Sequence, residues 1–386
     1  MSVSKNDDDA VRPFMLSVSE DELAELRNRL DRTRWQEREP VDDWSQGARL
    51  DKVRALCEHW RTAYDWRRCE EQLNSWGQFK TQLDGLDIHF LHIRSPHANA
   101  LPMLMTHGWP GSVIEFNKVI GPLTDPAAYG GDPKDAFHLV LPSLPGYGFS
   151  EKPSRTGWGV ERIARNWAVL MRRLGYDHYV AQGGDWGAAV TNQLGVDRPE
   201  GCAAIHLNIP IVYPTPEQMA DMTSAEEAAV KDWSEIEATG TGYLRIQSTR
   251  PQTLGYGLTD SPVGQAAWIY EKLHFWTDHD GAVENLLTMD EMLDNIMLYW
   301  LPATGGSSAR LYWESISKAF QTRSVEIPVG VSIFPKELSR PSRRWAEKAY
   351  SALFYWNELD KGGHFAAFEQ PRLFVDEMRR CFRLIR

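Results

Sequence analysis

The sequence predicts an α/β fold in which a mostly parallel central sheet carries helices on both faces. From Leu101 onward, short apolar segments alternate with helical stretches, which is typical of parallel strands joined by helical crossovers. This alternation stops between about residues 211 and 323, where helices and loops are expected but no strand. A largely helical segment precedes the first of these strands. Four parts follow: an N-terminal extension (1–95), the first part of the core (96–210), a helical insertion that would form a lid (211–325) and the second part of the core (326–386).

The N-terminal extension is expected to hold two helices and a β-hairpin. Residues 19–22, Ser-Glu-Asp-Glu, have the capping-box pattern and precede leucines at helical spacing, so a helix is predicted to begin there. A second helix is expected over Asp51–Ala63. Two strands, Phe79–Leu83 and Ile88–Ile93, flank Asp84-Gly85, a dipeptide typical of tight hairpin turns. The extension therefore leads directly into the sheet.

The core is expected to contribute the remaining strands and the helices between them. Its predicted strands are Leu101–Thr106, Phe137–Pro142, His178–Ala181, Ala203–Asn208, Ile327–Phe334 and Leu353–Trp356. One helix is expected over Val160–Leu174, another from Ala188 to about Gly195, and a last one from Pro371 to the end. Because ligands bind at the carboxyl ends of parallel strands, side chains that follow these strands are candidates for a functional site.

Composition and charge narrow the functional classes. A chain of 386 residues can bury a sizeable core without metal or disulfide crosslinks. The net charge of −11 argues against nucleic acid or an anionic membrane as a general partner. The four cysteines are scattered without a CxxC pair, so buried thiols are expected rather than disulfides or a zinc site. With no signal-peptide pattern and no run of about 18 apolar residues, we expect a cytoplasmic protein without a membrane anchor.

Gly-Gly-Asp-Trp-Gly at residues 183–187 lies where a strand would turn sharply into a helix. This G-x-nucleophile-x-G pattern usually presents a serine, and its small residues allow the tight backbone that lifts the nucleophile clear of the sheet. Here Asp185 takes that place, and a carboxylate can displace a leaving group from sp³ carbon to form an ester with the enzyme. Glycine and aspartate are also common in ordinary turns, so the five residues alone fit a plain turn as well. The rest of the chain favours the interpretation of Asp185 as a nucleophile.

An acid and a histidine follow this elbow in loops at later strand ends. Glu337 comes just past one strand, and His364 follows two glycines past the next. Nucleophile, acid, histidine is the chain order of an α/β-hydrolase triad. Asp360 is a rival acid, but it lies only four residues from His364 on the same connection, which is a poor arrangement for orienting the imidazole. We expect Asp185 to attack, His364 to activate the water that hydrolyses the ester, and Glu337 to orient the histidine.

Hydrolysis of such an ester also needs hydrogen-bond donors for the oxyanion. The N–H of Trp186, directly after the nucleophile, is one expected donor. The other is expected in the loop that begins at His107, where Trp109 offers an N–H and Pro110 has none. Both tryptophans are also expected to line the substrate pocket. His107 has no Asp or His partners at metal-binding spacing, so we expect it to shape this loop, and we expect no metal and no cofactor.

Five motifs together give the chain a specific resemblance. They are HGWPGS at 107–112, PGYGFS at 145–150, GGDWG at 183–187, FPKE at 334–337 and GGHFAA at 362–367. Over nearly its whole length the chain resembles the epoxide hydrolases, particularly the microsomal and juvenile-hormone type. The resemblance implies an α/β-hydrolase fold with an added N-terminal segment and a glutamate as the acid of the triad, which matches Glu337. Membrane-bound relatives carry an N-terminal anchor helix that this sequence lacks, which implies a soluble, bacterial-like form.

The resemblance also implies two lid tyrosines that assist departure of the epoxide oxygen. It selects Tyr243 and Tyr312. A neutral phenol suits this role at pH 7, because its pKa lies near about 10. Spacing alone does not choose these two, since the insertion contains further tyrosines at positions 213, 256, 270 and 299.

These features predict an epoxide hydrolase that converts an epoxide and water into a vicinal diol through an alkyl ester on Asp185. The many aromatic residues of the insertion favour a bulky or aryl-substituted epoxide. The alternatives are a haloalkane-type dehalogenase, which shares the aspartate nucleophile, and a catalytically silent α/β-hydrolase that serves as a binding module. The expected partners are a small-molecule epoxide and water rather than nucleic acid, and self-association into a homo-oligomer is left open.

Overall fold

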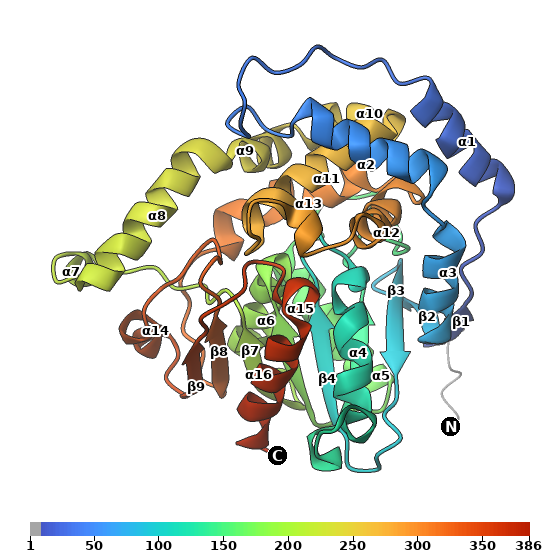
Figure 1. Cartoon of the computed structure of the whole chain (residues 1–386). Coiled ribbons are helices and arrows are strands. Elements are labelled where there is room, and N and C mark those ends of the chain that lie inside the picture. Colours follow the sequence, from blue (N-terminus) through green and yellow to red (C-terminus); the bar gives the residue numbers. More distant parts are fainter. Residues whose placement is uncertain (1–8) are drawn as a thin grey trace.

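The computed structural model describes residues 9–386, and their strands form one nine-stranded sheet (Figure 1). The strands are β1 (Arg12–Phe14), β2 (Gln78–Leu83), β3 (Leu86–Ile93), β4 (Leu101–Thr106), β5 (Phe137–Pro142), β6 (Tyr179–Gly183), β7 (Cys202–Leu207), β8 (Val329–Ile333) and β9 (Leu353–Glu358). Their order is β1-β2-β3-β5-β4-β6-β7-β8-β9. Along this order, the three pairings β1–β2, β2–β3 and β3–β5 are antiparallel. All the pairings that follow, from β5–β4 to β8–β9, are parallel. The predicted mostly parallel sheet is confirmed.

The chain changes direction across the sheet at β4. Strand β5 pairs on one side of β4 and β6 on the other, although the three strands follow one another in sequence. Such a switch point opens a crevice at the carboxyl ends of the two central strands, because the loops that leave them run in opposite directions. Thr106, the last residue of β4, lies in register with Gly183, the last residue of β6. The loop that begins at His107 and the elbow at Asp185 therefore leave the sheet side by side.

Helices cover both faces of the sheet, as predicted. The helices of the core are α4 (Asn117–Thr124), α5 (Val160–Arg173), α6 (Asp185–Asp197), α14 (Arg343–Ala349), α15 (Ala366–Glu369) and α16 (Pro371–Arg383). Figure 1 shows α4 and α16 on one face, with α5 and α6 on the other. The buried residues of α5 recur every three or four positions from Val160 to Met171, so one apolar stripe seats this helix on the sheet.

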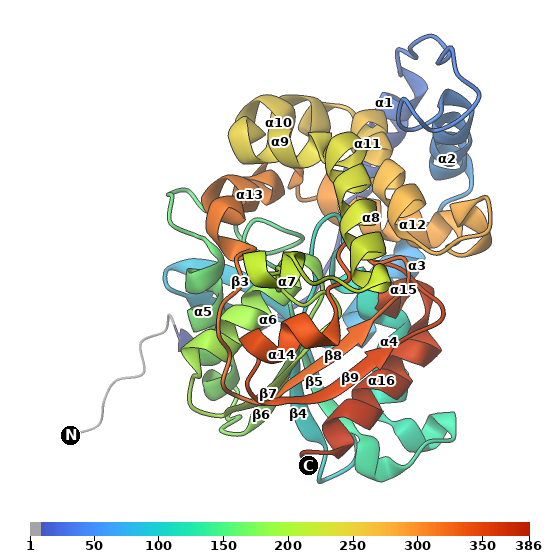
Figure 2. The same cartoon turned by 90° about the vertical axis from the view of Figure 1, so that its left-hand side faces the viewer.

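The segment between β7 and β8 is the predicted helical insertion. It holds α7 (Pro216–Met219), α8 (Ser224–Gly240), α9 (Gly242–Thr249), α10 (Pro251–Asp260), α11 (Pro262–Trp276), α12 (Met289–Trp300) and α13 (Gly305–Ala319). Residues 211–323 contain no strand, as expected. Figures 1 and 2 show α9 to α13 gathered at one end of the sheet, while α8 extends from this group towards α7.

The N-terminal extension packs against the insertion as well as the sheet. Its helices are α1 (Glu20–Asp31), α2 (Leu50–Thr62) and α3 (Trp66–Ser75), and the predicted capping box at Ser19 is present. Helices α1 and α2 lie beside α11 and α12 (Figure 1). Ion pairs also join the extension to the insertion, among them Arg29–Asp260 at 3.0 Å, Lys52–Glu284 at 3.4 Å and Arg68–Asp294 at 2.7 Å. The extension therefore ties the insertion to the rest of the molecule.

Some elements differ from the prediction. Helix α6 begins at Asp185, three residues before the predicted start, because the strand turns into the helix without an intervening loop. Its residues 186–195 are all buried, so no amphipathic pattern marks its start. Helices α3 and α14 and strand β1 were not predicted, since each is short and has few apolar residues to set a period.

Two further expectations concern the chain as a whole. Cys57, Cys69, Cys202 and Cys381 are all buried free thiols, as predicted. Within residues 9–386, none of the helices has the length and apolar composition required to cross a bilayer. The start of the chain, which lacks a signal-peptide pattern, falls mostly outside the described residues.

Candidate active site

Asp185 lies in the turn between β6 and α6 and is the first residue of that helix. Its φ of 50° is a left-handed conformation that is uncommon outside glycine, so the turn holds backbone strain. A Cβ on Gly183 would overlap the carbonyl oxygen of Gly187, and a Cβ on Gly187 would overlap that of Thr106 in β4. Gly184, by contrast, has room for a Cβ. The elbow therefore requires glycine at 183 and 187 because the backbone segments approach closely there.

Gly187→Ala is expected to destabilise the protein, with Gly184→Ala as the matched control. The new methyl at 187 would press on the backbone of β4, which cannot rotate away, and overpacking of this kind costs about 1–3 kcal/mol. The methyl at 184 would have the Asn208 Cβ as its nearest neighbour, at 3.9 Å. Urea unfolding of both variants measures the difference. Equal free energies of unfolding for the two variants would contradict the steric argument.

His364 lies between Asp185 and Glu337. Its Nε2 is 3.5 Å from Asp185 Oδ2, and its Nδ1 is 2.6 Å from Glu337 Oε1. The Glu337 oxygen also accepts a hydrogen bond from the N–H of Leu338 at 2.7 Å, which fixes the carboxylate. The side chains of His364 and Glu337 are 3% and 0% exposed, so this pair is shielded from bulk water. The structure thus brings together the three residues predicted as a triad.

The two carboxylates control the protonation of His364. Burial disfavours the imidazolium, but the negative charges of Glu337 and Asp185 outweigh it and raise the pKa of His364 well above its usual value. The two carboxylates therefore favour the protonated form of the histidine. Any change that removes the charge of Asp185 lowers the pKa of His364 and favours the neutral imidazole, which is the form that can accept a proton.

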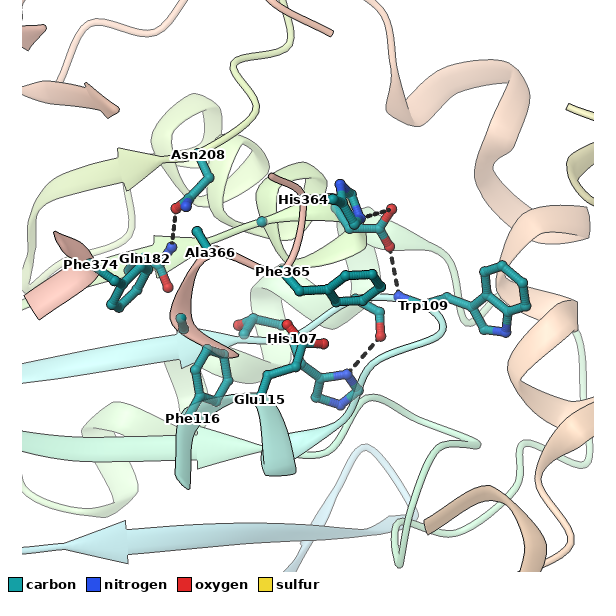
Figure 3. A pocket seen from close by; sticks show the side chains of 15 residues that line it. His107, Trp109, Glu115, Phe116, Gln182, Asn208, His364, Phe365, Ala366 and Phe374 are labelled. Atoms are coloured by element: carbon teal, nitrogen blue, oxygen red, sulfur yellow. Dashed lines mark hydrogen bonds and ion pairs between the residues drawn. The ribbon is translucent and has the colours of Figure 1, made fainter. Parts of the chain in front are cut away.

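Trp109 supplies a backbone donor to Asp185. Its N–H donates to Asp185 Oδ1 at 2.7 Å, so this oxygen is held and Oδ2 is the one left facing His364 (Figure 3). Trp186 is the second residue of α6, and amides in the first turn of a helix have no acceptor within that helix. Both predicted amides thus lie at the elbow, where the positive end of the helix dipole also favours negative charge.

Tyr243 in α9 and Tyr312 in α13 extend from the insertion to the elbow. The Tyr243 ring lies parallel to the Trp109 ring at 5.0 Å, and the Tyr312 ring meets Trp109 edge-on at 5.9 Å. The hydroxyl of Tyr312 is buried without a hydrogen-bond partner among the described residues. Burial and the nearby negative charge of Asp185 raise the pKa of both tyrosines above its ordinary value, so both phenols are neutral donors at pH 7.

The other tyrosines of the insertion are placed differently. Tyr213 and Tyr256 are exposed, and the hydroxyls of Tyr270 and Tyr299 donate to Glu284 Oε1 and the Gly111 carbonyl. The structure therefore separates 243 and 312 from the four residues that spacing alone could not exclude.

The remaining predicted residues also have defined places. Asp360, the rival acid, is exposed, whereas Glu337 is buried against His364. The buried indole of Trp186 meets the Tyr312 ring edge-on at 4.8 Å. His107 is buried, with Nδ1 against the Gly108 carbonyl at 2.9 Å and Nε2 accepting from the N–H of Leu144 at 3.1 Å. These contacts give His107 the loop-shaping position expected of it. In residues 9–386 no cluster of His, Cys, Asp or Glu is arranged to hold a metal ion.

Three polar residues beside the triad were not predicted. Glu115, Gln182 and Asn208 line a small cavity that also reaches Asp185 and His364 (Figure 3). Gln182 lies one residue before the end of β6, and Asn208 directly follows β7, so position at a strand end was the signal available for them. Glu115 lies in the 3₁₀ turn Val113–Phe116, eight residues past His107, and no general motif singles it out.

The fold and this site define an α/β-hydrolase whose nucleophile position holds a carboxylate. Residues 11–116 match the family described as epoxide hydrolase N terminus, and residues 102–239 match the alpha/beta hydrolase fold. A Stigmatella aurantiaca protein that carries a provisional epoxide hydrolase name is 58% identical over 97% of this chain and 86% of its own length. Epoxide hydrolase 1 of Sus scrofa is 34% identical over 98% of this chain and 90% of its own.

A solved structure agrees with these relatives. The crystal structure of juvenile hormone epoxide hydrolase from Bombyx mori superposes with a TM-score of 0.88 at 29% identity, covering 97% of this chain and 94% of that one. The chain belongs to the epoxide hydrolase family, and it is an enzyme of that type.

Proposed function

We propose that the protein converts an epoxide and water into a vicinal diol through an alkyl ester on Asp185. The observation that carries this proposal is the arrangement of three different groups around one aspartate. Trp109 N–H binds Oδ1 at 2.7 Å, His364 Nε2 stands 3.5 Å from Oδ2, and the rings of Tyr243 and Tyr312 pack on the ring of Trp109 at 5.0 and 5.9 Å. A nucleophile, a base and acids are thus separate groups, which is what a two-step opening and hydrolysis requires.

The first step needs no base, because a carboxylate is itself a nucleophile. Its Oδ2 attacks an epoxide carbon, the ring C–O bond breaks, and the electron pair stays on the epoxide oxygen. Tyr243 and Tyr312 stabilise that alkoxide and supply its proton. Their neutral state at pH 7 supports this role, and so does the Tyr312 hydroxyl, which is buried without a hydrogen-bond partner within residues 9–386.

The second step hydrolyses the ester. Alkylation cancels the charge of Asp185, and because that charge helps to raise the pKa of His364, the histidine loses its proton more readily. This proton replaces the one that the tyrosines gave to the alkoxide. Water then adds to the Asp185 carboxyl carbon while His364 Nε2 takes one of its protons. Charge on Oδ1 is stabilised by the N–H groups of Trp109 and Trp186. The tetrahedral centre collapses, the bond to the diol oxygen breaks, and the imidazolium returns the proton to that oxygen. The Asp185 carboxyl group then passes the remaining water proton to His364, which restores the carboxylate and the imidazolium.

Aromatic rings around the reacting groups favour a bulky or aryl-substituted epoxide. The ring of Trp276 lies 5.2 Å from that of Tyr243 and 5.0 Å from that of His364. Trp109 lies 6.1 Å from Trp276 and is flanked by Trp268 at 6.5 Å. An aryl substituent beside these rings would gain edge and face contacts in addition to burial of its apolar area. A panel that pairs styrene oxide with small alkyl epoxides of equal reactivity would test this preference through kcat/KM.

Replacing the two tyrosines distinguishes this proposal from the dehalogenase alternative. Tyr243→Phe or Tyr312→Phe removes one hydroxyl, and loss of one such donor typically slows a reaction by roughly 10² to 10³. Because the other phenol remains, each single variant should lie at or below the lower end of that range. The double variant should lose far more than the product of the two, since the alkoxide then has no acid. Single-turnover alkylation rates measure this effect, with exposed Tyr256→Phe as the control.

A dehalogenase predicts the opposite result. Halide departs without a proton, so the double variant would keep its rate, and wild-type protein would release chloride or bromide without forming diol from epoxides. A silent binding module would turn over neither class of substrate. Near wild-type epoxide opening by the double variant would exclude Tyr243 and Tyr312 as the acids.

A further inference from the structure

The cavity beside the triad is the size of one water molecule. Its volume is about 20 Å³, and a water needs roughly 10–15 Å³ of such space together with two or more polar partners. Asp185 and His364 form part of its wall, and so do the three polar side chains that the sequence did not predict. A water here adjoins both the carboxyl group that would carry the ester and the histidine that would activate the water.

The polar wall of this cavity has unused hydrogen-bonding capacity. The amide of Gln182 donates through Nε2 to Asn208 Oδ1 at 2.7 Å, which fixes its orientation. Gln182 is only 2% exposed, and its Oε1 is buried without a hydrogen-bond partner among the described residues. An acceptor left unpaired in the interior costs free energy, so a water donor in the cavity would satisfy it.

The backbone around Glu115 is built to place its carboxyl at this cavity. A Cβ on Gly111 would coincide with the Glu115 carboxyl, so the missing side chain at 111 makes the room that Glu115 fills. The 3₁₀ turn that carries Glu115 is capped by Ser112, whose Oγ accepts from the N–H of Ile114 and donates to Asn295 of α12 at 2.7 Å. Glu115 is thus held between the oxyanion loop and the insertion.

The protonation state of Glu115 suits a partner for water beside two other carboxylates. Burial raises its pKa to about 8, the positive charge of His364 opposes this shift, and the negative charge of Asp185 adds to it. At pH 7 Glu115 is therefore mostly a neutral acid, with one O–H donor and a carbonyl acceptor. It adds no third negative charge next to Asp185 and Glu337.

The other charged groups around this turn are already engaged. Lys118 of α4 pairs with Glu291 of α12 at 2.6 Å, and Glu369 of α15 accepts the N–H groups of Asp278 and Phe365. Tyr299 donates its hydroxyl to the Gly111 carbonyl at 2.6 Å. Asp185 and His364 are therefore the groups whose changes of charge can alter the pKa of Glu115.

We propose that Glu115 holds the water that hydrolyses the Asp185 ester, accepting a hydrogen bond from one water proton while His364 removes the other. This inference rests on the ester mechanism of the proposed function. The water oxygen bonds to the Asp185 carboxyl carbon, and the proton shared with Glu115 stays on that oxygen until the tetrahedral centre collapses. Glu115 acts in the second step only, since ring opening by Asp185 consumes no water.

Glu115→Ala and Glu115→Gln test this assignment with opposite expectations. Alanine removes the partner of the water, so ester hydrolysis should slow roughly 10- to 100-fold while alkylation stays near the wild-type rate. Glutamine keeps the shape and an acceptor, so hydrolysis at pH 7 should stay within about threefold of wild type. Glu377→Gln, a buried glutamate bound to Ser332 and Tyr355 on another part of the sheet, is the matched control. Rapid-quench intact mass with styrene oxide measures both steps.

The pH profile separates a water-holding role from a merely structural one. In wild type, hydrolysis should decline between about pH 7 and 9, because ionised Glu115 places a negative charge beside the forming oxyanion. Alkylation removes the negative charge of Asp185, which lowers the pKa of Glu115, and deprotonation removes the positive charge of His364, which raises it. Because these two effects oppose each other, the decline of the hydrolysis rate should stay near pH 8. Glutamine cannot ionise, so Glu115→Gln should lose this decline.

Two results would overturn the proposal. One is a Glu115→Ala variant that hydrolyses the ester at the wild-type rate or slows alkylation equally. The other is a Glu115→Gln variant that keeps the alkaline decline, and this readout stands even if the alanine variant folds poorly. Failure of the underlying function is seen separately, because His364→Gln would then form no ester adduct at all, which would also remove the basis for assigning Glu115.

Discussion

Asp185→Asn is expected to abolish epoxide turnover, with a loss on the order of 10⁶ in kcat as seen when other enzymes lose a covalent nucleophile. The amide is neutral and a far weaker nucleophile than the carboxylate, and it cannot form the ester. Its geometry is otherwise preserved, because the side-chain oxygen can still accept from the N–H of Trp109. Diol formation from styrene oxide measures the loss, with intact mass confirming that the amide has not reverted by slow deamidation.

Asp360→Asn provides the matched control for this change. Asp360 is exposed and lies near His364 in sequence, so the same substitution there should leave the rate unchanged. The origin of the oxygen gives an independent check. In ¹⁸O water, a single turnover with enzyme in excess should label the carboxyl group of Asp185 and leave the diol unlabelled, since water attacks the ester carbonyl. Label in the diol, or a full rate for verified Asp185→Asn, would exclude the covalent route.

His364→Gln is expected to separate the two half-reactions. Alkylation of Asp185 requires no imidazole, so the ester should form at a rate similar to that of wild type. Its hydrolysis loses the general base, which typically contributes 10² to 10⁴ in rate, and the ester should therefore accumulate. Intact mass after mixing with an epoxide should rise by the mass of one substrate per protein.

The pH dependence of hydrolysis in the wild-type enzyme provides a second measurement for His364. Only the neutral imidazole accepts a proton, so the hydrolysis rate should fall as the pH drops below the pKa that His364 has in the ester. That pKa lies below the strongly raised value of the free enzyme, because the ester lacks the charge of Asp185. His178→Gln, at an exposed position, controls for the substitution. Rapid multiple turnover by His364→Gln without an adduct would show that another group is the base.

Local sequence signals were sufficient for most of the fold. Capping residues, turn dipeptides and apolar periods act over a few neighbours, and they located helix α1, the hairpin at Asp84-Gly85 and the strands β4 and β5. The same signals predicted the mostly parallel sheet, because alternating strands and helices leave few other topologies. They did not locate α3, α14 or the start of α6, where short length or burial on all sides removes the period.

The sequence by itself determined which residue types follow the strands and in what order, including Asp185, Glu337 and His364. Only the tertiary structure decided how these side chains meet. It places Glu337, which the sequence already favoured over Asp360, at 2.6 Å from the imidazole. It also brings together Tyr243 and Tyr312, which the resemblance had selected, with their rings 5.9 Å apart. Glu115 shows the limit most clearly. Its place at the water-sized cavity depends on the missing side chain at Gly111 and on packing against a helix about 180 residues away, and no local pattern encodes such a contact.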